Sequence, residues 1–80
     1  MNALETLLRF EPKTGDCLIV KDSTGKTLYT EIFNLESPEP KDPKKAEKVR
    51  DLLNSDLEFL EVEPDDTGKN VLIFVHLELR

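Results

Sequence analysis

The chain has 80 residues and a formal net charge of -6, because 17 Asp and Glu residues outnumber 11 Lys and Arg residues. This length fits one ordinary domain. Leu, Ile, Val and Phe together make up 25 of the 80 residues. That share is well above the roughly 20% below which a highly charged chain stays unfolded. We therefore expect a folded domain with a small core.

Features that the sequence lacks disfavour several classes of protein. The longest apolar run is Val71 to Val75, whereas a membrane helix needs about 20 apolar residues. The single cysteine, Cys17, and the single histidine, His76, exclude a Cys/His zinc site and an intrachain disulfide. The acidic balance disfavours direct contact with nucleic acid or anionic lipid. We expect a cytoplasmic protein that contacts neither nucleic acid nor membrane directly.

The first half of the chain predicts one helix and one hairpin. Residues 2–10 place leucines at helical spacing, with Asn2 as the N-cap and Pro12 ending the segment. Residues 17–20 form a short apolar run, and residues 28–33 are rich in β-forming side chains. Turn-forming residues 22–26 separate these two runs. We therefore expect two antiparallel strands after the helix.

The second half begins after a proline-rich segment at residues 36–43, which we expect to be an exposed connector. Asp42 followed by Pro43 is typical of a helix start. Apolar residues then line one side of a helix that ends at Asn54 or Ser55. Residues 57–62 and 71–79 predict a second hairpin, whose last strand is long and central in character.

The element order α-β-β-α-β-β indicates an α+β domain. We expect a single compact domain over residues 1–80, with two αββ halves joined by the connector at residues 36–43. Its four-stranded, mainly antiparallel sheet carries both helices on one face. Asp, Thr, Gly and Lys recur at matching positions of residues 22–26 and 65–69, an offset of 43. An ancestral duplication and ordinary turn chemistry both explain this match.

The strands carry more apolar side chains than two short helices are able to cover. In the last strand, Leu72, Phe74 and His76 alternate with the expected core residues, and in the second strand Tyr29 and Phe33 form a matching set. We expect these five residues to form one protein-interaction patch on the helix-free sheet face, because large exposed apolar patches mark interfaces. The alternative is that sheet coiling or the connector buries them within one chain.

Acidic residues are concentrated between residues 51 and 66, where Lys and Arg are absent. The acidic patch that we consider consists of Glu58, Glu61, Glu63, Asp65 and Asp66. Spaced carboxylates of this kind resemble the phosphates of a nucleic acid and favour a basic groove. A net charge of this size is also what keeps an ordinary small domain soluble.

The sequence does not predict a catalytic, cofactor or metal site. Residues 20–27 match part of a phosphate-binding loop, but Val20 replaces its first glycine and a strand follows where a helix is needed. Cys17 and His76 form a catalytic pair only if they converge. Residues 65–68 lack the alternating acids and closing Glu of a calcium loop. We expect no cofactor, no metal and no small-molecule substrate.

The function expected from these patterns is therefore binding rather than catalysis. We expect a small acidic protein-binding or self-associating module, with a regulatory or adaptor role, that contacts a partner protein or a second copy in a homodimer through the helix-free sheet face. The alternative is an acidic inhibitor that imitates nucleic acid and blocks a DNA-binding or RNA-binding protein or a nuclease.

Overall fold

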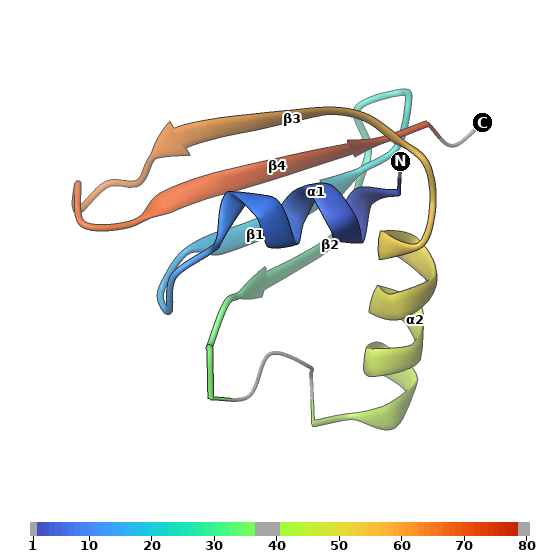
Figure 1. The fold of residues 1–80 in the computed structure, drawn as a ribbon, viewed down its shortest axis with the longest axis horizontal. Helices are drawn as coiled ribbons and strands as arrows, with labels where there is room; N and C mark the ends of the chain where they lie inside the picture. The colour runs from blue at the N-terminus through green and yellow to red at the C-terminus, as the bar shows by residue number, and fades with distance from the viewer. Residues whose placement is uncertain (1, 37–40, 79–80) are drawn as a thin grey trace.

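The computed structural model describes residues 2–36 and 41–78, and within them it contains two helices and four strands (Figure 1). The elements are α1 (Ala3–Phe10), β1 (Cys17–Lys21), β2 (Thr27–Ile32), α2 (Pro43–Leu53), β3 (Leu57–Pro64) and β4 (Val71–Leu77). This order confirms the α+β class and the predicted succession of elements. Residues 37–40 of the predicted connector lie outside the described residues.

Both helices begin at the predicted caps. The Asn2 side chain accepts a hydrogen bond from the backbone N–H of Glu5 at 3.0 Å. The Asp42 side chain accepts one from the N–H of Lys44 at 2.9 Å, and Pro43 takes the first helical position. These contacts satisfy donors that a helix start otherwise leaves unpaired. Glu11 ends α1 in the left-handed conformation, with φ 58°.

The sheet is mixed, so the predicted mainly antiparallel sheet is wrong. Its strand order is β2-β1-β4-β3, and the central strands β1 and β4 run parallel, with Cys17 opposite Leu72 and Val20 opposite Val75. The two hairpins β1–β2 and β3–β4 are antiparallel, as expected. The near-continuous apolar runs of β1 and β4 fit their central positions in the sheet, but they do not by themselves specify a parallel pair, since the helices cover only one side of both strands.

A buried carboxylate joins the starts of the two central strands. Asp16 is 4% exposed, and its Oδ1 accepts hydrogen bonds from the Val71 N–H and from Asn70 Nδ2, both at 3.1 Å. Its Oδ2 accepts from the Lys13 N–H at 2.8 Å. Gly15 precedes it with φ +98°, and a Cβ there would lie 2.8 Å from Asn70 Nδ2. Asp16 therefore holds β1 beside β4, and a side chain at position 15 would be strained by the positive φ and would displace the Asn70 amide that donates to Asp16.

The core lies between the two helices and one face of the sheet, which we call the inner face. α1 lies in front of the sheet and crosses α2 steeply (Figure 1). Inner-face side chains Val20, Val75 and Leu77 are fully buried, and Leu7 and Leu53 cover them from α1 and α2. No helix of the described residues is long and apolar enough to cross a membrane.

The two matching turns have the same local structure but join strands in different places. Asp22 Oδ1 accepts from the Thr24 N–H at 2.9 Å, and Asp65 Oδ1 accepts from the Thr67 N–H at the same distance. The strand before the first turn, β1, is central, whereas the strand before the second, β3, is at an edge. The match therefore reflects shared turn chemistry, and the strand order does not support duplication of a whole αββ unit.

Truncation of a core side chain on the central strands should be costly. Leu77 is 0% exposed, and Leu77→Ala should lower the free energy of unfolding by about 2–5 kcal/mol through lost burial and a new cavity. That is a large part of the stability of a domain this small. Leu35→Ala, at a leucine that is 61% exposed, should cost far less. Urea unfolding of both variants measures this, and equal losses would contradict the described core.

The Asp16 clamp predicts a pH-dependent loss of stability. Burial alone would raise the pKa of Asp16, but hydrogen bonds from Lys13, Asn70 and Val71 outweigh it and leave that pKa below 3.8. Because the folded-state pKa is the lower one, this stabilisation is present above about pH 4 and is lost as the pH falls towards the folded-state value. An asparagine at this position replaces one carboxylate oxygen by an NH2 group, so a donor that now points at that oxygen would face another donor. Asp16→Asn should therefore lower the free energy of unfolding by about 1–3 kcal/mol at pH 7.

Unfolding of Asp16→Asn and of the unaltered protein should be compared at pH 7 and near pH 3. The difference in the free energy of unfolding between the two proteins should be smaller at the lower pH, because the Asp16 carboxyl of the unaltered protein is then itself being protonated. Asp66→Asn, at an exposed turn position, serves as the control and should behave like the unaltered protein at both pH values. If the difference in the free energy of unfolding stays constant with pH, the role assigned to the Asp16 carboxylate is contradicted.

Candidate functional site

The candidate site is the sheet face opposite the helices, which we call the outer face. The strand register assigns to it Cys17, Ile19 and Lys21 of β1, Thr30 and Ile32 of β2, Phe59, Glu61 and Glu63 of β3, and Leu72, Phe74 and His76 of β4. Both described helices pack on the inner face, so neither covers this one. Ile32 is 59% exposed and Phe59 is 44% exposed. The face has an apolar centre with charged residues along its sides.

Aromatic and charged groups are in contact at one end of the outer face. The His76 ring stacks on Phe59, with centroids 4.0 Å apart and planes inclined by 15°. His76 Nε2 donates a hydrogen bond to Glu61 Oε1 at 2.7 Å. Lys21 Nζ lies 5.3 Å from the centroid of the Phe74 ring, within cation–π range. These contacts connect β1, β4 and β3 across the sheet and hold the side chains in defined positions.

The structure brings together three of the five residues predicted for the interaction patch. Leu72, Phe74 and His76 lie on the outer face, whereas Tyr29 and Phe33 do not, and their predicted placement there is wrong. Tyr29 pairs with the buried Val20 and packs against the core. Phe33 lines a cavity beside the helices. Alternation shows which residues share a face of a strand, but not which face the helices will cover.

Burial and a neighbouring acid explain the chemistry of Tyr29. Burial raises its pKa, with further contributions from its hydrogen bond to Glu31 and the charge of Glu31, to about 12. The phenol therefore stays protonated at neutral pH and donates to Glu31 Oε2 at 3.1 Å. Tyr29 completes the inner face at the β2 edge and is not available to the outer face.

Sequence reasoning missed the outer-face residues Cys17, Ile19, Ile32 and Phe59. For the first three, the sequence contained the information, because successive residues of a strand point to opposite faces and each of the three is next to a residue of the inner face. The same information was present for Phe59, because it is opposite in parity to the inner-face Leu60. A β-bulge between Leu57 and Phe59 inserts one extra residue, and this shift keeps Leu57 with the core although it has the same parity as the outward Phe59.

The acidic patch is spread over different surroundings. Glu58 occupies the bulge, whereas Glu61 and Glu63 lie on the outer face and Asp65 and Asp66 follow β3. Glu61 is held by His76. Asp65 Oδ1 accepts from the Thr67 hydroxyl and from the backbone N–H groups of Thr67 and Gly68, and these hydrogen bonds lower its pKa. Two of the five carboxylates are therefore already engaged within the chain.

Cys17 and His76 do not approach each other. Cys17 lies opposite Leu72, and His76 lies opposite Lys21 on the same strand pair. Four residue steps along a strand correspond to about 13 Å, too far for an imidazole to take the thiol proton. Burial, followed by the charge of Glu31, raises the pKa of the Cys17 thiol. The thiol is therefore less ionised at neutral pH than an ordinary one.

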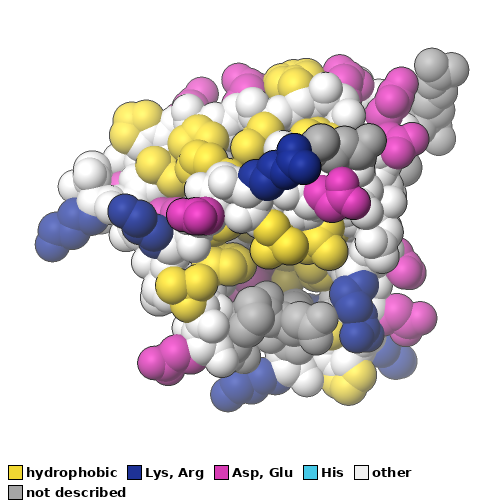
Figure 2. All heavy atoms as spheres, in the orientation of Figure 1, with side chains coloured by type: hydrophobic (Ala, Val, Ile, Leu, Met, Phe, Trp, Pro, Cys, Tyr) yellow, Lys and Arg dark blue, Asp and Glu magenta, His cyan; other side chains and the backbone are white. Residues whose placement is uncertain are grey.

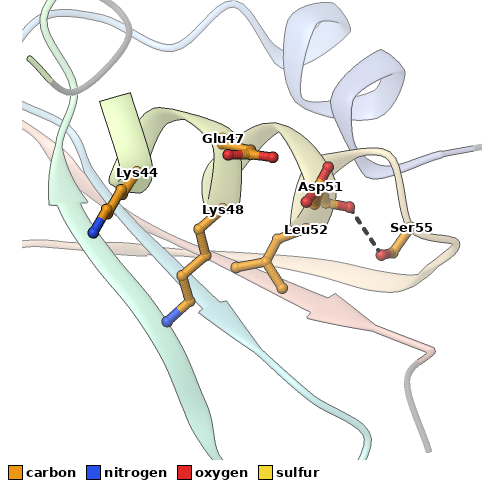
Figure 3. Close-up of a pocket in the computed structure, with 6 residues that line it drawn as sticks. All are labelled: Lys44, Glu47, Lys48, Asp51, Leu52 and Ser55. Carbon is orange, nitrogen blue, oxygen red and sulfur yellow. Dashed lines mark hydrogen bonds between the residues drawn. The ribbon is translucent and has the colours of Figure 1, made fainter. Parts of the chain in front are cut away.

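A shallow depression on the exposed side of α2 offers no distinct chemistry. Figure 3 shows Lys44 and Lys48 pointing to the same side of the helix, while Glu47 and Asp51 balance their charge. Ser55 Oγ donates to the Asp51 carbonyl at 3.3 Å. Among residues 2–36 and 41–78, no group of three or more His, Cys, Asp or Glu side chains is placed to hold a metal ion.

Comparisons with known proteins add no family to this description. No family model, no curated protein and no solved structure matches the chain. The function must therefore be argued from the residues and their geometry.

The position of Cys17 predicts slow thiol chemistry. Because its pKa is raised, mainly by burial, alkylation by iodoacetamide at pH 7 should be slower than that of free cysteine, and its rate should still be rising with pH above about pH 8.5, where the rate of free cysteine begins to level off. The control is the double variant Cys17→Ser, Leu35→Cys, measured at low protein concentration, which carries its single thiol at an exposed position. Fast alkylation of Cys17 at pH 7 would contradict its placement and would indicate an activated thiol.

Proposed function

We propose that this protein is a small, non-catalytic binding module that associates with a second copy of itself through the outer face. The observation that carries the proposal is an apolar centre on the side of the sheet that neither described helix covers. Exposed apolar side chains that adjoin one another are uncommon on proteins that stay monomeric. Such a module has a regulatory or adaptor role, since its effect depends on whether the contact is made.

The composition of the outer face supports a protein contact. Ile19, Leu72 and Phe74 occupy its centre, and Phe59 and Ile32 extend the apolar surface towards the two sheet edges. Aromatic and aliphatic residues at the centre with charges at the rim are typical of protein interfaces. The stacked and hydrogen-bonded His76 is already ordered, so association does not have to restrict its motion further.

The distribution of charge favours a second copy as the occupant. Glu61 and Glu63 lie on β3, whereas Lys21 lies on β1, on the other side of the apolar centre. We place the two-fold axis parallel to the strands, so that β1 of one copy lies over β4 of the other. In such a symmetric interface every contact between two residues occurs twice. Lys21 then lies one strand to the side, about 4.8 Å, and one residue row along the strand, about 7 Å, from the partner's Glu61. Two such pairs form.

The size of the face predicts weak association. Four strands spaced by about 4.8 Å, with about six residues each rising about 3.3 Å, give a face of roughly 400 Å². Stable interfaces bury about 800 Å² on each partner. We therefore expect a concentration-dependent dimer in the micromolar range or weaker, rather than a permanent one.

The nucleic-acid mimic remains the rival proposal, but it has less support. Glu61 and Asp65 are engaged by groups within the chain, and Lys21 shares the face with the acids. The two proposals differ in their salt dependence. Binding of a basic partner by a mimic weakens steeply as salt rises, because ions screen the attraction. Self-association of chains with net charge -6 should persist or strengthen, because screening reduces their repulsion.

Replacement of Phe74 tests the proposal. Sedimentation equilibrium of the unaltered protein should show dimers at high concentration, in low and high salt alike, and Phe74→Asp should be monomeric because a buried charge opposes apolar packing. Phe10→Asp, the same change at a phenylalanine in α1, should leave dimerisation unchanged. Alkylation of Cys17 should slow as the protein concentration rises. A protein that stays monomeric at millimolar concentration would overturn the proposal.

A charge-reversal pair provides a variant that leaves the apolar centre intact. Lys21→Glu alone and Glu61→Lys alone should each weaken the dimer several-fold, and the double variant should recover most of the loss. If the double variant is no better than the single ones, the arrangement with an axis parallel to the strands is wrong even if a dimer forms.

A further inference from the structure

A second hollow lies on the other side of the sheet, between α1, α2 and the β1–β2 side of the inner face. Its volume is about 360 Å³. Among the described residues that line it, all but Arg50 and Asn54 are apolar. The apolar ones include Leu7 of α1, Leu18 of β1, Phe33 after β2, and Val49 and Leu53 of α2. Figure 2, which looks onto the helices, shows apolar side chains gathered between α1 and α2.

The floor of this hollow consists of core side chains. Leu7, Leu18 and Val49 are each buried and line it together. A water molecule stays in a protein interior only where several polar groups bind it, and these three side chains offer none. Apolar walls without neighbouring atoms also lose dispersion contacts. The floor therefore favours an apolar occupant over water.

The wall nearest to solvent comes from α1. Leu4, Leu7 and Leu8 follow the spacing of an apolar helix face, and all three line the hollow. Leu7 is buried, yet Leu8 is 62% exposed. α1 has only eight residues and crosses α2 steeply, so the two helices do not lie side by side over the sheet (Figure 1). A molecule in the hollow would cover apolar surface of α1 that α2 leaves uncovered.

The polar residues of the lining favour a neutral ligand. Arg50 and Asn54 are exposed, which places them at the mouth and leaves the floor apolar. Arg50 already interacts with another group of the chain, so its charge does not need a ligand of opposite charge. A charged ligand would also lose its hydration beside the apolar floor without gaining a partner there.

We propose that this hollow binds a neutral, apolar small molecule of about the size of a benzene ring with a short alkyl chain. An engineered apolar cavity of about 150 Å³ takes up benzene, so a volume of 360 Å³ has room for a ring and several further carbons. That volume also lies at the small end of ligand pockets, about 300–1,000 Å³. The ligand is bound and not transformed. The site lies on the opposite side of the sheet from the outer face, so neither proposal depends on the other.

A series of alkylbenzenes tests the size of the ligand. Benzene, toluene, ethylbenzene and butylbenzene should bind with affinities that rise by up to about fourfold for each added CH2. NMR titration below the solubility limit of each compound measures these affinities. The rise should stop once the hollow is filled. Affinities that do not change along the series would overturn the proposal.

Charged analogues test the neutrality of the ligand. Phenylbutanoate and phenylbutylammonium carry the ring and chain of butylbenzene with a negative or a positive charge at the end. Both should bind about tenfold or more weakly than butylbenzene, because the charge loses hydration near the apolar floor. If either charged compound binds as tightly as butylbenzene, the assigned ligand class is wrong.

A cavity-filling variant tests the site itself. The ring that Val49→Phe adds should occupy the hollow, so this variant should unfold at nearly the same urea concentration as the unaltered protein and should bind butylbenzene about tenfold or more weakly. Val75→Phe makes the same change at a fully buried valine that is not among the lining residues. It should unfold at a clearly lower urea concentration, because overpacking a filled core causes strain. If Val49→Phe is destabilised as much as Val75→Phe, or fails to fold, the space beside Val49 is already filled and the proposal fails.

A map of the shifted NMR signals locates the bound molecule. Butylbenzene should shift the methyl signals of Leu7, Leu18 and Leu53, which line the hollow. Shifts confined to Ile19 and Leu72 would show that the compound binds to the apolar centre of the outer face instead, and would rule out the hollow as the site.

Discussion

The parallel pairing of β1 with β4 is the constraint on which the rest of this structure depends. Asp16 fixes it at one end by accepting the N–H of Val71 and the side chain of Asn70. Every carboxylate oxygen there has a donor, so the buried charge is stabilised rather than costly. The N-terminal and C-terminal hairpins are joined into one sheet through this pair.

The same strand pair produces both surfaces of interest. Its inner side chains, such as Val20 and Val75, complete the core with the helices. Its outer side chains, Ile19 and Phe74 among them, form the centre of the uncovered face. The described residues supply two short helices, and both pack on the inner face and leave the outer face without a helix. The proposed dimer interface is a consequence of this shortage of covering elements.

Local sequence patterns predicted the elements well and their assembly less well. Asn2 and Asp42 cap the helices as expected, and the residues at the two Asp-led turns form hairpins. These features depend on neighbours in sequence, so the pattern contains the cause. The parallel β1–β4 contact joins residues more than fifty positions apart, and nothing local specifies it. The continuous apolar character of both strands fits their central positions but does not specify their direction.

For the candidate site, the sequence determined which side chains share a face along each strand, because that alternation is a property of the backbone. It therefore placed Leu72, Phe74 and His76 together. Only the tertiary structure decided that Tyr29 and Phe33 turn towards the helices and that Leu57 and Phe59, two residues apart, lie on opposite faces. The physical reason is that a strand's two sides are equivalent until a helix covers one of them, and that a single bulge reverses the sides of every residue beyond it.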